Sequence, residues 1–264
     1  MTEYQWNRLS APALQYHAEH DAVVMLPVGS TEQHGEHLPT GVDLFLAAEA
    51  CLRAAAILEE AGMPVVCAPG LPWGLSEHHM AFGGTLTLPL TTYYALIRDV
   101  CASIQRSGFQ RIVVVNGHGG NISALNAIVD QLSLDLPGAD ISVATYVTVA
   151  RDQIEEILET QDSIMHACEG ETSMMLAAFP ELVATGMLSR ATGPVSGLRS
   201  DAVPLYRWRS FRDVTANGVS GDARGATADK GARLLDVCAE ALAHQIMVDG
   251  GHEPGTAPPN PKLT

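Results

Sequence analysis

Carboxylate and imidazole side chains gather in one segment near the N-terminus, which runs Gly-Ser-Thr-Glu-Gln-His-Gly-Glu-His-Leu-Pro-Thr-Gly-Val-Asp from Gly29 to Asp43. In an extended backbone Glu32 and His34 point the same way, because side chains alternate with period two. Asp43, at the start of the next expected helix, can close a site with them. Such ligands suit divalent zinc, manganese or iron. We predict that Glu32, His34 and Asp43 bind metal; the alternative is a solvated loop with Asp43 as a helix cap.

A second motif, Asn-Gly-His-Gly-Gly-Asn, runs from Asn116 to Asn121 and follows the most clearly apolar strand pattern in the chain. His118 is a further candidate metal ligand. Its flanking glycines, Gly119 among them, let the backbone come close to a substrate. A phosphate-binding glycine loop is an alternative, but the spacing is neither that of a P-loop nor that of a dinucleotide motif. A simple strand-to-helix turn capped by Asn121 is another.

Two further segments carry groups that suit catalysis. His166, Glu169 and Glu171 precede an apolar helical run, where acids also suit a helix N-terminus. Cys168 between them lacks the motif of a thiol nucleophile, so we expect it to pack in the core. In the loop near residue 80, Ser76 and His78 are expected to contact substrate or order the loop, because adjacent histidines diverge and suit one metal poorly.

These residues need a scaffold, and the alternation of short apolar runs with longer helical patterns supplies one. We expect strands at 22–28, 64–68, 111–115 and 141–149, and helices at 44–61, 90–107, 122–136, 171–179 and 229–248. The pattern predicts a three-layer α/β fold with a mostly parallel β-sheet flanked by helices. Ligands bind beyond the carboxyl ends of such strands, which is where the residues after positions 28 and 115 should meet.

The chain of 264 residues reads as a single domain over 1–250 with a flexible, proline-rich tail at 251–264. Residues 69–89 and 180–228 lack clear periodicity, and the second stretch is expected to face substrate or another subunit. We expect helix caps at Thr91 or Thr92 and at Asn121.

Composition excludes several classes of protein. With 15 Lys and Arg against 30 Asp and Glu, the net charge is −15, which argues against nucleic acid and anionic membranes as partners. Five widely spaced cysteines without a Cys-x-x-Cys pair argue against disulfides. The N-terminal residues do not have the pattern of a signal peptide, and we expect a cytoplasmic protein.

Taken together and in this order, the four segments resemble the creatininase (creatinine amidohydrolase) family, over residues 23 to about 231, including the late stretches 217–222 and 226–231. The resemblance implies an α/β fold, two divalent metal ions, a homohexamer and hydrolysis of a non-peptide C–N amide bond, often in a ring. It places Glu32, His34, Asp43 and His118 on the family's metal ligands, with Asp43 as the bridge. Ser76 falls on a substrate-contacting serine, and His166 on the histidine beside the leaving group.

One departure affects the ligand set and the substrate. Family members that act on creatinine have a glutamate ligand and an aromatic residue where this chain has Gly120 and Gly119. We expect Glu171, or failing that Glu169, to complete the second metal site and to accept a proton from water. The main prediction is a metal-dependent amidohydrolase that opens a small cyclic amide and protonates the leaving nitrogen from His166.

Other activities stay open at this stage. Within the family, the Gly-Gly form also resembles members that cleave formamides or trim a peptide-derived redox cofactor. Outside it, a metal-binding protein without catalysis predicts a closed site, and a nucleotide-binding domain predicts stabilisation by nucleotide without metal.

Overall fold

Four parallel strands form the centre of the computed structural model, which describes residues 2–195, 205 and 207–251. The sheet has the order β2-β1-β3-β4, with Val23 paired to Val65 on one side and to Arg111 on the other. Its strands are β1 (Val23–Val28), β2 (Val65–Cys67), β3 (Arg111–Asn116) and β4 (Asp140–Thr145). The central strands are rich in valine and buried, as expected for a parallel sheet covered on both faces.

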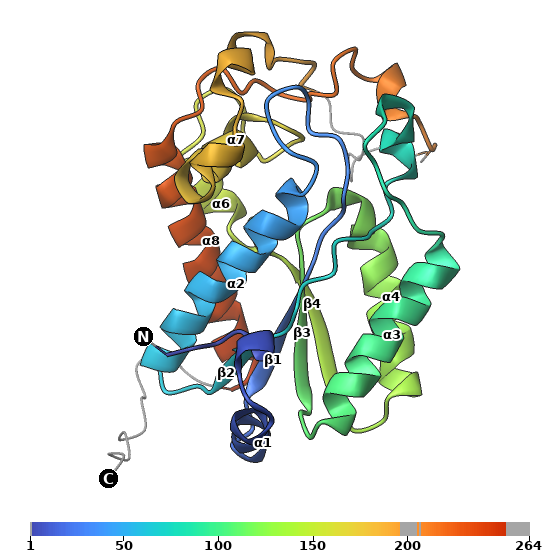
Figure 1. Cartoon of the computed structure of the whole chain (residues 1–264), viewed down its shortest axis with the longest axis vertical. Coiled ribbons are helices and arrows are strands. Elements are labelled where there is room, and N and C mark those ends of the chain that lie inside the picture. The colour runs from blue at the N-terminus through green and yellow to red at the C-terminus, as the bar shows by residue number, and fades with distance from the viewer. Residues whose placement is uncertain (1, 196–204, 206, 252–264) are drawn as a thin grey trace.

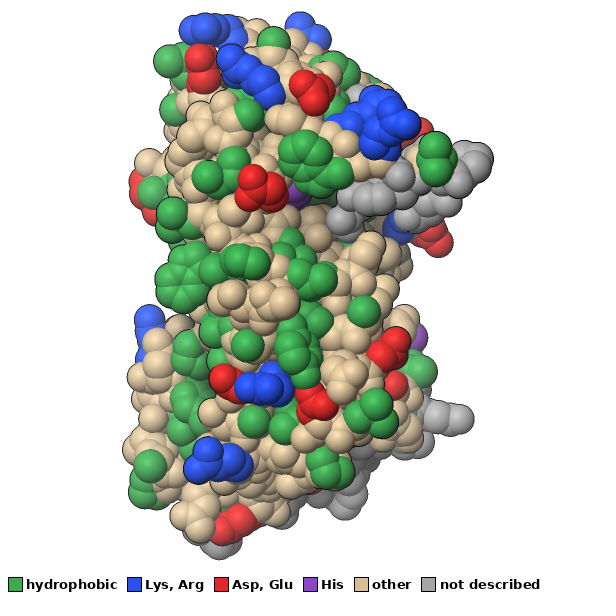
Figure 2. All heavy atoms as spheres, turned by 90° about the vertical axis from the view of Figure 1, so that its right-hand side faces the viewer, with side chains coloured by type: hydrophobic (Ala, Val, Ile, Leu, Met, Phe, Trp, Pro, Cys, Tyr) green, Lys and Arg blue, Asp and Glu red, His purple; other side chains and the backbone are tan. Residues whose placement is uncertain are grey.

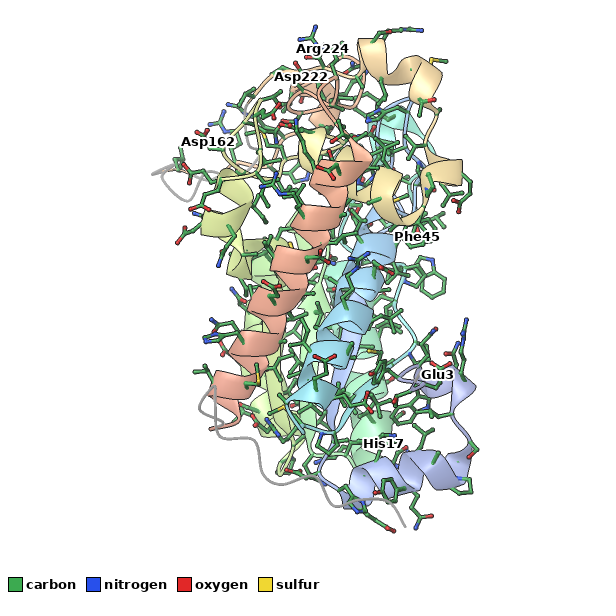
Figure 3. The ribbon with its side chains drawn as sticks, turned by 90° about the vertical axis from the view of Figure 1, so that its left-hand side faces the viewer. Glu3, His17, Phe45, Asp162, Asp222 and Arg224 are labelled. Atoms are coloured by element: carbon green, nitrogen blue, oxygen red, sulfur yellow. The ribbon has the colours of Figure 1, made fainter. Side chains whose placement is uncertain are left out.

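Helices cover both faces of this sheet, which confirms the predicted three-layer α/β fold. Side chains of β1 alternate between two cores, with Met25 in one and Leu26 in the other. The first core lies under α2 (Val42–Glu60), α5 (Tyr146–Val149), α6 (Arg151–Glu155), α7 (Glu169–Ala178) and α8 (Ala228–Asp249), and the second under α1 (Ala11–Glu19), α3 (Leu90–Arg106) and α4 (Ile122–Asp135). Figure 1 shows α2 and α8 on one side of the sheet and α3 and α4 on the other. Figure 3 shows α2 and α8 side by side.

Several predicted boundaries were wrong by a few residues. The strand expected over 141–149 ends at Thr145, and the chain turns at once into α5, because Tyr146 packs into the core beside α8. Pro89, with its fixed φ, precedes α3 in place of Thr91 or Thr92. The first helix of the expected set begins at Val42, with Gly41 before it. Asp43 therefore lies inside the first turn of α2 and does not cap it.

Where the structure describes them, the two aperiodic stretches contain short 3-10 helices and irregular backbone. Their bounds are η2 (Glu77–Phe82), η4 (Pro180–Leu182), η5 (Thr185–Arg190) and η6 (Phe211–Asp213). Residues 196–204 and 206 lie outside the described part, as does the tail from 252 onward, so the predicted flexible tail stays a prediction. The single domain over 1–250 also stays a prediction. None of the described helices combines the length and the apolar character that crossing a bilayer requires.

Candidate metal centre

Close backbone packing brings the N-terminus of α2 to the carboxyl edge of the sheet. Gly29, just after β1, leaves so little room that a Cβ there would stand 2.5 Å from the backbone nitrogen of Leu44. A Cβ at Gly117, just after β3, would overlap the carbonyl oxygen of Asp43. Both glycines are needed because they let α2 enter between the ends of two neighbouring strands. This packing positions the carboxylate of Asp43 over the sheet edge.

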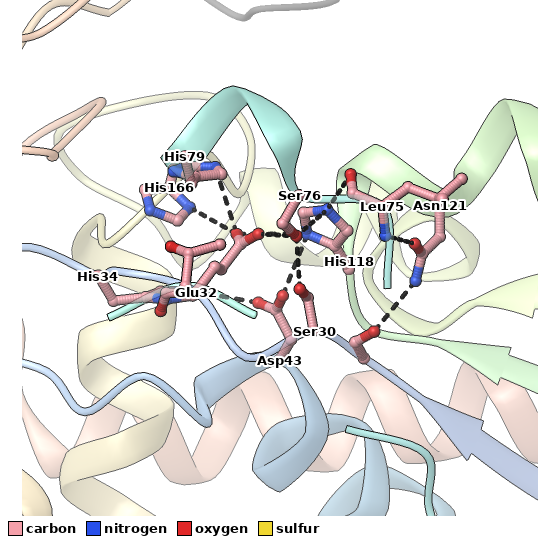
Figure 4. A network of polar contacts seen from close by, with 12 residues as sticks. Ser30, Glu32, His34, Asp43, Leu75, Ser76, His79, His118, Asn121 and His166 are labelled. Carbon is pink, nitrogen blue, oxygen red and sulfur yellow. Dashed lines mark hydrogen bonds and ion pairs between the residues drawn. The ribbon is translucent and has the colours of Figure 1, made fainter. Parts of the chain in front are cut away.

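Five of the predicted ligands converge at this edge and are buried. Their donor atoms form two groups that share Asp43, and within each group all donor atoms lie within 4.8 Å of one another. One group contains Glu32, Asp43 and His118, and the other contains His34, Asp43 and Glu171. Asp43 is therefore placed to contribute to both. Figure 4 shows Asp43 between His34 and His118, with Glu32 above.

The histidine orientations show which nitrogen of each ring faces the carboxylates. Nδ1 of His34 donates to the carbonyl oxygen of Glu32 at 3.0 Å, and its Nε2 lies 3.2 Å from Oδ1 of Asp43. Nε2 of His118 donates to the carbonyl oxygen of Leu75 at 3.3 Å, and its Nδ1 lies 3.1 Å from Oδ2 of Asp43. Each ring therefore turns its other nitrogen towards carboxylate oxygens, and this contact needs a positive charge, either a proton on the imidazole or a metal cation between the two groups. A metal-binding imidazole typically donates a hydrogen bond from the nitrogen that does not bind the metal, as both rings do here.

Electrostatics supports a bound cation. Burial lowers the pKa of His34, but the carboxylates of Asp43, Glu171 and Glu32 outweigh that effect and raise the pKa to about 9. The same competition raises the pKa of His118 well above its usual value. Burial raises the pKa of Glu171 to about 7. In the described part of the chain, Oε1 of Glu32, Nε2 of His34 and Oδ2 of Asp43 are buried without a hydrogen-bond partner. A divalent cation satisfies such groups.

Ser76, predicted to contact substrate, is fully buried against the ligands themselves. Its hydroxyl donates to Oε2 of Glu32 at 2.5 Å, lies 3.1 Å from Nε2 of His118 and also contacts the hydroxyl of Ser30. Asn121, expected as a side-chain cap, instead accepts a hydrogen bond from the nitrogen of Leu75 and donates to the carbonyl oxygen of the glycine after β1. Both side chains therefore fix the loops that carry the ligands (Figure 4).

Gln33 orients the two histidines above the cluster, a role that sequence reasoning missed. Nε2 of His166 donates to the backbone carbonyl of Gln33 at 2.7 Å, which leaves Nδ1 unprotonated, 3.5 Å from Oε1 of Glu32. The side-chain amide of Gln33 donates to Nδ1 of His79 at 2.8 Å and to the carbonyl of Gly218 at 3.2 Å. Burial and the neighbouring imidazoles hold the pKa of His166 well below its usual value. The signal in the sequence that could have pointed to this role is that Gln33 lies between two predicted ligands, Glu32 and His34.

The structure separates Glu171 from Glu169. Glu171 joins the metal ligands, and its Oε2 accepts a hydrogen bond from the nitrogen of Ala167 at 2.5 Å. Glu169 points elsewhere and is satisfied by Nζ of Lys230 at 2.6 Å and by the nitrogen and hydroxyl of Thr160. We therefore favour Glu171 as the ligand. Cys168 is buried, and burial raises its pKa to about 11, as expected for a packing role.

An open cavity of about 1480 Å³ leads from solvent to the cluster, and the candidate contact residues His78 and Gly119 line it. His78 stacks on His118 with ring centroids 5.6 Å apart. A Cβ at Gly119 would meet nothing within 4 Å, whereas one at Gly120 would overlap the ring of His118. Gly120 therefore cannot carry a ligand in this structure, and the open position at Gly119 widens the cavity.

A family model described as creatinine amidohydrolase matches residues 7–246. The chain belongs to the creatininase family. Among creatininase relatives, a mycofactocin precursor peptide peptidase of Mycolicibacterium smegmatis is 32% identical over 229 residues, covering 85% of this chain and 84% of that protein. A creatinine amidohydrolase of Pseudomonas putida is 31% identical over 243 residues, covering 86% and 89%.

A solved creatininase also shares the fold. A mutant creatininase described as Zn-Zn type aligns with a TM-score of 0.77 at 27% identity, over 94% of this chain and 99% of that one. Membership of the creatininase family and the buried cluster together support a hydrolase that binds divalent metal.

Proposed function

We propose that this protein is an amidohydrolase that uses two divalent metal ions per chain. Glu32, Asp43 and His118 would hold one ion, and His34, Asp43 and Glu171 the other. The observation that carries the proposal is the buried convergence of two imidazoles and three carboxylates, in which Nε2 of His34 and Nδ1 of His118 lie 3.2 Å and 3.1 Å from the two oxygens of Asp43. Imidazole and carboxylate donors accept zinc, manganese or iron.

Residues of the chain would carry out the proton transfers and contact the substrate. When bound, the metal ions would acidify a water molecule and polarise the amide carbonyl. Glu171 lines the cavity and is the carboxylate placed to take a proton from water. Nδ1 of His166 faces the cluster with its ring held by the carbonyl of Gln33, so His166 is placed to accept the proton that Glu171 takes from water and to pass it to the leaving nitrogen. His78 and Gly119 line the approach to this point.

Two classes of substrate fit the proposal, and the cavity favours one of them. A small cyclic amide is the first expectation from the sequence. The cavity of about 1480 Å³ exceeds the roughly 300–1,000 Å³ of pockets for drug-sized ligands, which favours a longer, peptide-like amide. A relative named as a peptide peptidase is consistent with that second class. Formamides remain a third option within the same reaction.

A metal-binding protein without catalysis fits less well. Structural metal sites are closed, whereas Glu32, Asp43, His118 and Glu171 all line a cavity that opens to solvent. The cytoplasmic location and the homohexamer stay predictions, which fractionation and size-exclusion chromatography can test.

Two ligand variants test the function directly. We expect Glu32→Gln and His118→Ala to lose bound metal and amidase activity, while His244→Ala, an exposed position on α8, keeps both. Metal content is measured by elemental analysis after gel filtration, and activity with lactams, formamides and short peptides. Full metal occupancy and activity in both ligand variants would show that the cluster is not the active site.

A further inference from the structure

The cavity continues well beyond the metal centre, along the surface between α3 and α4. Its outer wall is apolar and includes Leu88, Leu90, Tyr94, Ala127 and Ile128. Figure 2 shows hydrophobic side chains gathered over this face, next to a hollow in which a histidine is visible. The wall offers far more apolar surface than a small ring would cover. An apolar portion of a larger substrate fits it.

Positive charge collects on the same cavity although the chain as a whole is acidic. Arg151, Arg207 and Arg209 line the cavity, and apart from the metal ligands Glu77 is the one carboxylate among the described lining residues. Away from the metal ligands, the described lining therefore has three cations and one anion, in a sequence whose acids outnumber its bases by 30 to 15.

These arginines also differ from several arginines elsewhere in the molecule that pair with carboxylates. Arg53, Arg98 and Arg224 pair with carboxylates at 2.6–2.8 Å. None of the three on the cavity wall has an ion-pair partner in the described ranges. A guanidinium presents a planar fork of donors that matches a carboxylate.

We propose that the substrate carries a free carboxylate and an apolar segment near the amide that is cut, as an N-acyl amino acid or a short peptide does. Arg151, Arg207 and Arg209 would bind the carboxylate, and the wall formed by α3 and α4 would bind the apolar segment. This inference rests on the proposed amidohydrolase function. It gives a binding role to the part of the cavity that a small neutral lactam would leave empty.

A matched pair of binding probes tests the assignment without needing the natural substrate. Phenylbutyrate and phenylbutanol share an apolar body and differ in the carboxylate. We expect isothermal titration of the metal-loaded protein to show phenylbutyrate binding at least about 10-fold tighter, since a hydrogen bond to a charged group is worth about 10- to 100-fold. The triple variant Arg151→Gln, Arg207→Gln, Arg209→Gln should remove this preference and leave phenylbutanol unchanged. Arg224→Gln, outside the cavity, is the control.

A second pair of variants tests the apolar wall. Leu90→Gln should weaken both probes alike, whereas Leu134→Gln, which is 75% exposed and does not line the cavity, should weaken neither. All of these side chains are exposed, so the variants should fold.

The inference is wrong if the two probes bind equally, or if the preference survives in the triple arginine variant because the carboxylate binds the metal ions. Either result leaves the amidohydrolase proposal standing, since amide hydrolysis and its loss in Glu32→Gln are measured separately. If the metal-loaded protein hydrolyses no amide, the proposed function fails and this inference fails with it.

Discussion

Gly119 and Gly120 are neighbours that allow a matched test of the metal centre. A Cβ at Gly120 would overlap Nε2 of His118 and stand 2.6 Å from the carbonyl oxygen of Leu75, while a Cβ at Gly119 would meet nothing within 4 Å. Neither glycine has a positive φ, so both backbones accept alanine. The two substitutions therefore add the same methyl group, one residue apart, with opposite steric consequences.

The size of the effect follows from these distances. Ordinary contact begins at 3.4 Å and the Cβ would overlap Nε2 of the ring, so Gly120→Ala forces the ring of His118 back by more than about 1 Å, against the fixed backbone at Leu75. Metal–ligand distances tolerate only about 0.2 Å. We expect Gly120→Ala to lower metal affinity or activity about 10- to 100-fold, the range found when the support of a ligand is removed. Gly119→Ala should keep metal and gain up to about 1 kcal/mol of stability, because alanine favours the helical backbone.

Elemental analysis, amidase assays and thermal melts of both variants check this prediction. Metal loss and low activity in Gly120→Ala, with both retained in Gly119→Ala, is the expected result. Equal metal content and activity in the two variants would refute the reasoning, because it would mean that His118 is free to move or is not a ligand. A fall in thermal stability of both variants by the same amount would also contradict it.

The remaining predictions concern the supports of the site. Ala167 has a φ of 54°, and we expect Ala167→Gly to be neutral or stabilising and Ala167→Val to be clearly destabilising by urea unfolding. Lys230→Met leaves the carboxylate of Glu169 buried and unpaired, and should cost about 3–5 kcal/mol, which the added change Glu169→Leu should largely restore. Glu169→Gln should keep its metal while Glu171→Gln loses it; the reverse result by elemental analysis would make Glu169 the ligand. Chelation should lower the melting temperature by roughly 10 °C for metal present at 1,000 times its Kd, and zinc or manganese should restore it.

Much of the fold can be predicted from the sequence because its signals are local. The apolar runs that became β1 and β3 and the glycines that end them are contiguous, and parallel strands bring their carboxyl ends to one edge. Boundaries were less predictable where a tertiary contact decides them. Tyr146 ends β4 by packing beside α8, nearly a hundred residues later in the chain.

The residues of the candidate site were likewise predictable only where the signal is local. Glu32, His34 and Asp43 were predictable because they follow one strand within a short segment, and His118 because it follows another. The roles of Ser76 and Gln33 were not, since each depends on partners from distant segments that only folding brings near.

The sequence by itself determined the reaction chemistry available to this protein: carboxylates and imidazoles placed directly after buried strands. Only the tertiary structure decided between Glu169 and Glu171. Side chains two residues apart on a helix point in nearly opposite directions, and the local sequence does not say which of the two faces the site. Lys230, 61 residues further along the chain, pairs with Glu169, and that leaves Glu171 beside His34 and Asp43.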